Sequence, residues 1–183
     1  ARNLREAMQS FLLTHLALEI EVTGCGYSLG YLGHAFQPYY EKDLAEGVTS
    51  REEALYLMEL LFIKLQEIGY YHGPKFAKAW SSHVGQTLCI GGITPDGKDA
   101  TCEMDYIICD AHIYLQFIQP PLALFWHAGL KEDFLFKCVE VIKTGIGHPQ
   151  VMNTEVCVAR VLDRFAEDGA TIQDARRVAI FGC

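Results

Sequence analysis

The last residue of the sequence, Cys183, is the side chain whose type and position most directly suggest chemistry. It follows Gly182 at the end of a short apolar run, "VAIFGC". Upstream, Thr171 and Asp174 form a capping-box pattern that predicts a helix over 171–177, and the apolar run predicts a strand over 178–183. A strand that ends on Gly-Cys would present a thiol at the tip of a loop, provided that more protein follows.

Three histidines are further candidates, because each lies near a predicted loop or strand end: His34, His83 and His127. A histidine in such a place can orient a substrate or move a proton. The alternative for each is a hydrogen-bonded structural histidine. No two histidines have the spacing of a metal site, so we predict no metal in this chain. The carboxylates fall mainly on helix faces that we expect to be solvated.

The sequence holds seven cysteines, an odd number, without a CxxC pair. This spacing favours neither a disulfide framework nor a zinc site. Cys25 lies in a glycine-punctuated loop, where it could line a pocket or be an ordinary loop residue. The remaining internal cysteines are expected to be core thiols, since unpaired cysteine behaves as a small hydrophobe: Cys89, Cys102, Cys109, Cys138 and Cys157. So many free thiols suit a reducing cytoplasm.

The composition is that of a globular protein, with 50% apolar and 21% charged residues. A net charge of -8 argues against binding to nucleic acid or to an anionic membrane surface, because both need a basic patch. No segment approaches the roughly 20 apolar residues of a membrane span. A basic, apolar leader with a small-residue cleavage site is also missing, so we expect a cytoplasmic location.

Apolar residues recur at helical spacing in several stretches, with short apolar runs between them. We predict helices over 4–22, 49–69, 100–118, 131–145, 155–167 and 171–177. We predict strands over 86–92, 120–127 and 178–183, a strand or irregular segment over 148–153, a turn over 94–99 and a loop over 23–40. Thr49 with Glu52 marks the start of the second helix, and Gly69 marks its end.

Apolar strands that alternate with helices indicate an α/β fold, in which helices cover a parallel or mixed sheet. No repeat, linker or change of composition divides the chain, so we treat residues 1–183 as a single segment.

Several longer motifs occur in one order along the chain: "LGYLGHAFQPYYEKDL", "EEALYLMELLFIKLQEI", "QTLCIGGITPDGKDATCEMDYII", "QPPLALFWH", "CVEVIKTGIGHPQVMN" and "DARRVAIFGC". Together they resemble the middle of a glycyl radical enzyme of the pyruvate formate-lyase-like group, over essentially the whole chain. The resemblance implies that this segment is part of an α/β barrel. It also implies that Cys183 is the radical relay, converted to a thiyl by a glycyl radical on a separate loop.

The chain ends before the glutamate that commonly follows the relay cysteine in this family, and before the glycine-radical motif. The glycine that carries the radical therefore lies outside this chain. We expect a fragment of a larger enzyme, or a piece completed by another chain, and we expect it to be inactive alone. The resemblance further implies a small-molecule substrate, an S-adenosylmethionine-dependent iron–sulfur activase and a homo-oligomer.

The loop before Gly30 narrows the substrate class. Diol-cleaving relatives usually carry His-Ser where Cys25 and Gly26 stand, followed by "GRxDQ", whereas this chain has "GYLGH". Tyr31 thus replaces the arginine, Gly33 the aspartate and His34 the glutamine. A polyol pocket that lost these polar groups would leave substrate hydroxyls unpaired, which makes a polyol less favourable. The 4-hydroxyphenylacetate decarboxylase branch resembles this chain more closely at the positions of Cys25 and Gly33.

Two further positions favour an apolar substrate. Many relatives have an arginine where Phe125 stands, whereas the arylacetate decarboxylases have an apolar residue. Gly85 stands where the decarboxylases have a phenylalanine that faces the substrate, which would enlarge the pocket. Because side chains alternate along a strand, only one of Phe125 and Trp126 can face that pocket, and the other packs under helices.

Four functional hypotheses remain open from the sequence. The first is an anaerobic radical lyase that decarboxylates an arylacetate-like acid. The second, in the same class, is a diol dehydratase or another C–O or C–N lyase. The third, from another class, is a non-catalytic remnant or an interaction subunit that keeps the fold without the radical. The last is a generic α/β binding domain, which the ordered motifs disfavour.

Overall fold

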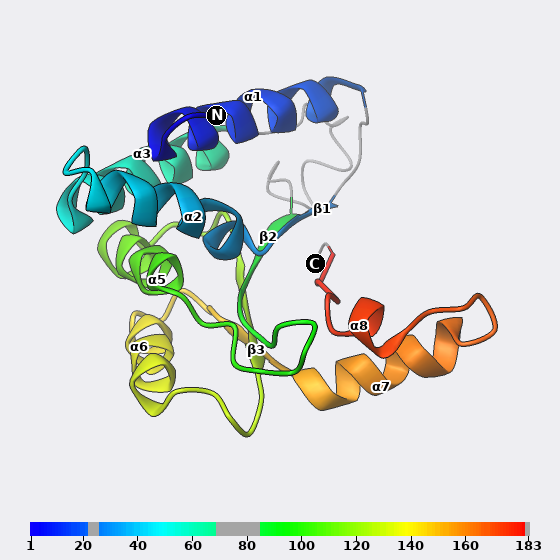
Figure 1. Ribbon diagram of the computed structural model, residues 1–183. Helices are drawn as coiled ribbons and strands as arrows, with labels where there is room; N and C mark the ends of the chain where they lie inside the picture. Colours follow the sequence, from blue (N-terminus) through cyan, green and yellow to red (C-terminus); the bar gives the residue numbers. More distant parts are fainter. Residues whose placement is uncertain (22–25, 69–84, 182–183) are drawn as a thin grey trace, which may run out of the picture.

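Residues 1–21, 26–68 and 85–181 are described in the computed structural model (Figure 1). Along the chain the elements are α1 (Leu4–Glu21), β1 (Gly26–Gly30), α2 (Leu32–Ala45), α3 (Arg51–Glu67), β2 (Gly85–Gly91), α5 (Glu103–Leu115), β3 (Leu122–Trp126), α6 (Glu132–Lys143), β4 (Gln150–Asn153), α7 (Thr154–Phe165) and α8 (Ile172–Ala175). None of these helices is both long enough and apolar enough to cross a membrane.

The described strands form one parallel sheet in the order β1-β2-β3-β4. Gly26 lies opposite Gly85, Leu88 lies opposite Leu122, and the remaining pairs continue in the same direction. The strands therefore share an amino end, where Gly26 and Gly85 lie, and a carboxyl end. The predicted α/β fold with a parallel sheet is confirmed, and the predicted strands over 86–92 and 120–127 correspond to β2 and β3.

The two faces of the sheet differ in what covers them. Helices α1, α2, α3, α5 and α6 share one core with the strand residues Leu88, Ile90, Leu122 and Leu124, and this side is called the outer face. Figure 1 shows α7 and α8 on the opposite side, which is called the inner face. The end of the chain returns past α8 toward the sheet on this inner side (Figure 1).

The loop predicted over 23–40 is wrong for the described residues, because β1 and α2 occupy most of it. Leu32, Phe36 and Tyr40 are spaced one helical turn apart and are all buried on one side of α2. Pro38 lies inside this helix. A proline in a helix interior costs about 3 kcal/mol. Burying each large apolar side chain contributes about 1.5–3 kcal/mol, so packing outweighs the lost backbone hydrogen bond.

The strand predicted over 178–183 is wrong for residues 178–181, which join no sheet. Val178 and Ile180 instead pack against the buried residues of the inner face. A strand within a sheet and a segment packed across the face of a sheet both require alternating apolar residues. The sequence pattern therefore does not distinguish the two arrangements. Gly182 and Cys183 lie outside the described residues.

Helix starts are close to their predicted places. Thr171 and Asp174 form the predicted capping box, with Thr171 Oγ1 accepting a hydrogen bond from the Asp174 backbone N–H. The helix that follows is shorter than predicted. In α3 the cap is Ser50, whose Oγ accepts from the Glu53 N–H at 3.2 Å, so the prediction of Thr49 is wrong by one residue. Gly69, predicted to end that helix, lies outside the described residues.

Candidate active site

The inner face of the sheet carries a small dry cluster. Cys89 and Ala123 lie opposite each other on β2 and β3, and Phe125 follows on the same face of β3. All three are buried, with at most 2% exposure. Trp126, the next residue, packs with the core of the outer face. The predicted alternation of Phe125 and Trp126 is therefore confirmed, and the inner face is a surface from which water is excluded.

Residues 178–181 lie against this face and run toward the amino end of the sheet. The Tyr31 hydroxyl donates to the Val178 carbonyl at 3.0 Å, and a Cβ placed on Gly92 would lie 3.1 Å from the same hydroxyl. Two residues later, the Ile180 backbone makes a hydrogen bond with the Cys89 side chain. Burial raises the pKa of the Cys89 thiol to about 11, against the opposing effect of that bond. The segment thus passes from the level of Gly92 to the level of Cys89.

A polar group lies at the carboxyl end of the sheet. His34 Nε2 is 3.6 Å from Asp105 Oδ2, and the His34 ring stacks on Tyr31 with 4.9 Å between centroids. Asp105 is completely buried; its Oδ2 accepts from the Cys102 N–H, and its Oδ1 has no hydrogen-bond partner among the described residues. The expectation of solvated carboxylates is therefore wrong for Asp105. Burial, followed by the charge of Asp105, raises the pKa of the Cys102 thiol.

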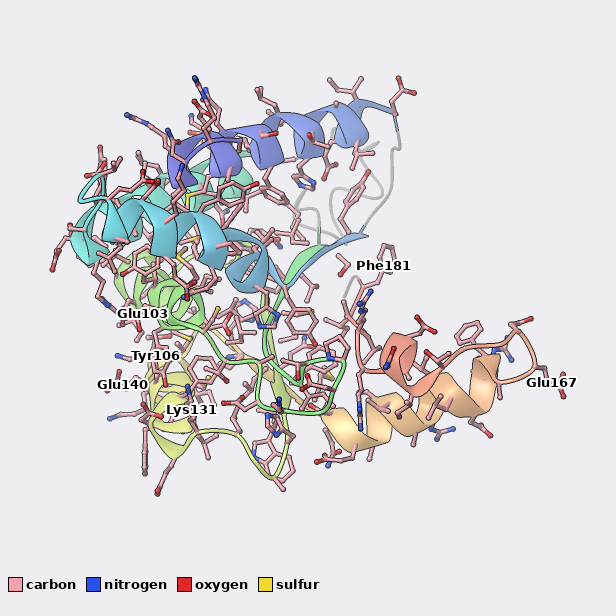
Figure 2. All side chains as sticks on the ribbon, viewed as in Figure 1. Glu103, Tyr106, Lys131, Glu140, Glu167 and Phe181 are labelled. Carbon is pink, nitrogen blue, oxygen red and sulfur yellow. The ribbon has the colours of Figure 1, made fainter. Side chains whose placement is uncertain are left out.

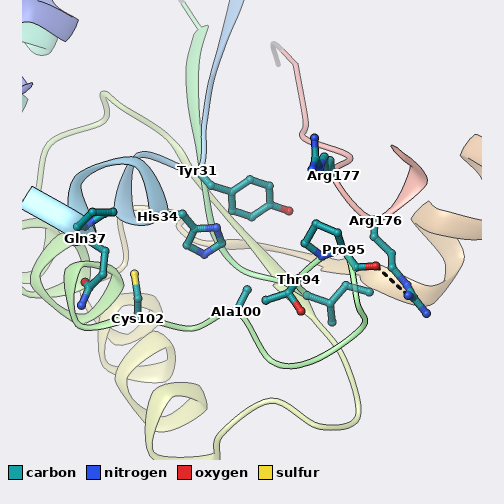
Figure 3. Close-up of a pocket in the computed structure, with 11 residues that line it drawn as sticks. Tyr31, His34, Gln37, Thr94, Pro95, Ala100, Cys102, Arg176 and Arg177 are labelled. Carbon is teal, nitrogen blue, oxygen red and sulfur yellow. Dashed lines mark hydrogen bonds between the residues drawn. The ribbon is translucent and has the colours of Figure 1, made fainter. Parts of the chain in front are cut away.

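A cavity of about 400 Å³ opens beside this polar group (Figure 3). Its lining residues include Tyr31, His34, Ile93, Cys102, Arg176 and Arg177, and no acidic residue is among those described. Arg176 is held in place, because its Nη1 donates to the Pro95 carbonyl at 3.0 Å. Apolar walls with cationic side chains can accommodate an organic anion.

Among the residues that the structure describes, one group could hold a metal ion: His34, Cys102 and Asp105. Their possible ligand atoms all lie within 4.8 Å of one another. Zinc is bound at about 2.0–2.3 Å by nitrogen, sulfur and oxygen ligands. Atoms spread over 4.8 Å would have to move together to share one ion. The prediction that the chain holds no metal stays a prediction.

His127 is engaged within the chain through both ring nitrogens. Its Nε2 lies 3.2 Å from Asp99 Oδ1, and its Nδ1 accepts a hydrogen bond from the Gly129 N–H at 3.2 Å. The second bond requires an unprotonated Nδ1, so Nε2 carries the proton and donates to Asp99. The ring is buried, and its two partners fix its orientation. These contacts are those of a histidine that orders the loop after β3.

The structure divides the predicted site residues between the two ends of the sheet. Gly85 begins β2 at the amino end, whereas His34, Phe125 and His127 lie toward the carboxyl end. A strand rises about 3.3 Å per residue, so the two ends of β2 are about 20 Å apart. One small pocket does not contact both groups. Cys25, His83 and Cys183, the other predicted site residues, lie outside the described residues.

The buried thiols are those expected of a core. Cys89, Cys109 and Cys138 are buried, and Cys102 and Cys157 are half-buried. No disulfide joins any of these cysteines. Asp105 and the role of Tyr31 in holding Val178 were missed from the sequence. Because 147 positions separate Tyr31 from Val178, no local pattern indicates their contact.

The model of the pyruvate formate lyase-like family matches residues 1–183. The chain belongs to this family. It is 32% identical to the 4-hydroxyphenylacetate decarboxylase glycyl radical subunit of Clostridioides difficile and covers 20% of that protein. It is 33% identical to the indoleacetate decarboxylase of Tractidigestivibacter scatoligenes and covers 21% of it. Both matches extend over 100% of this chain.

A solved structure concerned with 1,2-propanediol dehydration in Roseburia inulinivorans superposes with a TM-score of 0.94 at 33% identity. That match covers 100% of this chain and 23% of the solved chain. The chain thus spans about a fifth of the length of the curated relatives that it matches. The predicted resemblance and the barrel fold class are confirmed, and the family is one of enzymes that use a glycyl radical.

Proposed function

We propose that residues 1–183 form one segment of the α/β barrel of a larger glycyl radical lyase, in which a thiyl radical on Cys183 starts substrate cleavage. The observation that carries this proposal is the course of residues 178–181. They leave α8, lie on the dry inner face and head toward the amino end of the sheet, with Gly182 and Cys183 next in sequence. A glycine before the cysteine allows the backbone to approach a substrate closely.

The inner face fits radical chemistry. The glycyl radical, carried by another part of the enzyme, supplies the means to remove a hydrogen atom from the Cys183 thiol. The chain's own residues keep water from the part of the inner face on which residues 178–181 lie, because Cys89, Ala123 and Phe125 are buried and uncharged. Gly85 begins β2 at the amino end, toward which the segment runs, and has no side chain to occupy that place.

We propose decarboxylation of an arylacetate-like acid as the reaction. The substrate would lose its carboxylate as carbon dioxide, and its methylene carbon would gain, in the overall balance, one proton to become a methyl group. Two relatives named for arylacetate decarboxylation support this choice, together with the loss of side-chain bulk at Gly85. Cys25 and His83 would line the same end. His34 and His127 lie toward the opposite end.

The second candidate is a diol dehydratase or another C–O or C–N lyase. The solved structure concerned with 1,2-propanediol dehydration supports it, since its backbone superposes over the whole chain. The replacement of the His-Ser pair of diol-cleaving relatives by Cys25 and Gly26 argues for the first candidate over this one. A non-catalytic remnant is the remaining alternative, and a gene that ends at Cys183 without a companion chain carrying the radical glycine would favour it.

The proposal includes partners. An S-adenosylmethionine-dependent iron–sulfur activase would install the glycyl radical in the complete enzyme, which would act on a small molecule in the cytoplasm as a homo-oligomer. Neither nucleic acid nor a membrane is proposed as a partner, in keeping with the net charge of -8.

The test uses the complete polypeptide, activated without oxygen and offered arylacetates and small polyols separately. We expect carbon dioxide and a methylarene from an arylacetate, and no product from the Cys183→Ala variant. Turnover of propanediol or glycerol without carbon dioxide would replace the decarboxylase proposal by the second candidate. Activity that survives Cys183→Ala would overturn the relay itself.

A further inference from the structure

We infer that Tyr31 is a positioning residue, which sets the place of the Cys183 thiol by holding the Val178 carbonyl on the inner face. The inference rests on the proposed relay role of Cys183, but not on the identity of the substrate. It assigns a purpose to the phenol at the position where relatives carry an arginine. Three observations carry it: a fixed donor, a segment without other lateral support, and a short covalent path to the thiol.

The first observation is that the Tyr31 hydroxyl is a fixed donor. Its ring stacks on His34 with an interplanar angle of 7° and packs against Phe125 with 5.7 Å between centroids. Gly92 leaves the space that the hydroxyl needs, since a Cβ there would come within 3.1 Å of it. Burial raises the pKa of Tyr31, and nearby acidic groups add to this effect. The phenol therefore stays protonated and donates to Val178.

The second observation is that residues 178–181 lack the support of a sheet. They form no ladder with the described strands. The Val178 N–H bonds back to the Ala175 carbonyl, which only continues the turn after α8. Lateral placement on the inner face then depends on apolar packing and on two hydrogen bonds, from Tyr31 to Val178 and between Ile180 and Cys89. Apolar packing is non-directional, so the two hydrogen bonds determine the register.

The third observation is the shortness of the path. Cys183 follows Val178, which Tyr31 holds, by five positions, so at most about 18 Å of chain separates their Cα atoms. A shift at Val178 or Ile180 is passed on to the thiol with little room for correction. Hydrogen-atom transfer requires near contact of the two reacting atoms, and a displacement of about 1 Å costs on the order of 100-fold in rate.

The test measures hydrogen transfer without any substrate. In D₂O the Cys183 thiol becomes S–D. The S–D group transfers its deuterium atom to the glycyl radical, which leaves a thiyl radical on Cys183. The thiyl radical then takes the hydrogen atom from the same glycine carbon and restores the glycyl radical. One hydrogen atom moves in each direction, so no other reactant is needed. Repeated transfer replaces the hydrogen on the glycyl carbon, and its splitting disappears from the electron paramagnetic resonance spectrum. The rate of that loss, followed by rapid freezing of the activated complete enzyme, reports the approach of the thiol.

The variant is Tyr31→Phe, and the matched control is Tyr106→Phe. The Tyr106→Phe variant also loses a hydroxyl hydrogen bond, which Tyr106 donates to Asp133 at 3.0 Å. Tyr106 lies on the helical side of the molecule, far from Phe181 (Figure 2). We expect exchange in Tyr31→Phe to slow by about 5-fold if only one hydrogen bond is lost. We expect it to slow by about 100-fold if the thiol moves by about 1 Å. We expect Tyr106→Phe to exchange at the wild-type rate. Radical content and melting temperature should match between the two variants.

Each outcome separates this inference from the proposed function. If the wild-type enzyme does not exchange, or if Cys183→Ala still does, the relay fails and the role of Tyr31 fails with it. If the wild type exchanges and Tyr31→Phe keeps its rate, the relay stands and the positioning role is refuted. If Tyr31→Phe does not fold, Cys89→Ala tests the second hydrogen bond. It should slow exchange as well, and a wild-type rate in that variant refutes the inference.

Discussion

The Asp105 carboxylate occupies the space that a side chain at position 33 would need. This predicts that the effect of Gly33→Ala on stability changes sign when Asp105 is replaced. A Cβ on Gly33 would overlap Asp105 Oδ1 and lie 3.1 Å from Asp105 Cγ. The carboxylate has little freedom to withdraw, because Asp105 is completely buried and its Oδ2 accepts from the Cys102 N–H at 3.2 Å. Gly33→Ala should therefore destabilise the protein, although alanine is the better helix former.

The expected magnitude follows from two opposing terms. An extra methyl in a packed site costs about 1–3 kcal/mol. Replacing a helical glycine by alanine returns about 0.5–1 kcal/mol. The net loss for Gly33→Ala therefore lies between about 0 and about 2.5 kcal/mol, with a middle value of about 1 kcal/mol. In an Asp105→Ser background the overlap disappears and only the second term remains, so the same substitution should stabilise by about 0.5–1 kcal/mol. The coupling between the two positions is then about 1–3 kcal/mol.

The assay compares melting temperatures of four proteins: the wild type, each single variant and the double variant. The sign of the shift caused by Gly33→Ala should reverse between the two backgrounds. Gly129→Ala serves as the control, because its added Cβ would meet nothing closer than 3.4 Å, an ordinary contact. Equal shifts for Gly33→Ala with and without Asp105 would refute the argument, since they would mean that the carboxylate does not occupy this space.

Two further predictions concern pH and capping. Burial lowers the pKa of His112 from 6.5 to about 3, so stability present above pH 6.5 is lost as the pH falls toward 3. Between pH 7 and pH 5 the loss from His112 should be about 2 kcal/mol in chemical unfolding, and His112→Phe should remove it and leave only a smaller loss from His148, whose pKa burial also lowers. Ser50→Ala should lower the unfolding free energy by about 1 kcal/mol, whereas Thr49→Ala should change it little. Equal losses for both serine and threonine variants would contradict the observed cap.

The sequence predicted those elements whose signals are local. The helices over 51–67 and 132–143 have periodic apolar residues, and the strands over 85–91 and 122–126 are short apolar runs bounded by glycine or proline. Helix α2 was missed because Pro38 and the glycines near its start dominate the local pattern. Its buried stripe of Leu32, Phe36 and Tyr40 is a usable signal. Tertiary packing thus overrides propensity where a full helical face is buried.

The site was predicted less well, for a different reason. The family resemblance led to Cys183 and to the residues around it in sequence, but it could not place them relative to the sheet. The contacts of Tyr31 with Val178 and of His34 with Asp105 join residues far apart in the chain. The resemblance noted only that an aspartate stands in relatives where Gly33 stands. Asp105 brings a carboxylate to that position from another helix, which no single-position comparison reveals.

The direction in which residues 178–181 run indicates which end of the sheet a thiol beyond them would approach. In open parallel α/β sheets ligands usually bind beyond the carboxyl ends of the strands. The cavity beside His34, Arg176 and Arg177 has that location. Residues 178–181 begin near this cavity and lead away from it, since Val178 is held at the level of Gly92 and Ile180 at that of Cys89. A thiol three positions beyond Ile180 reaches the cavity only if the chain reverses. The substrate of the proposed relay thiol would therefore lie at the amino end of β2, beside Gly85.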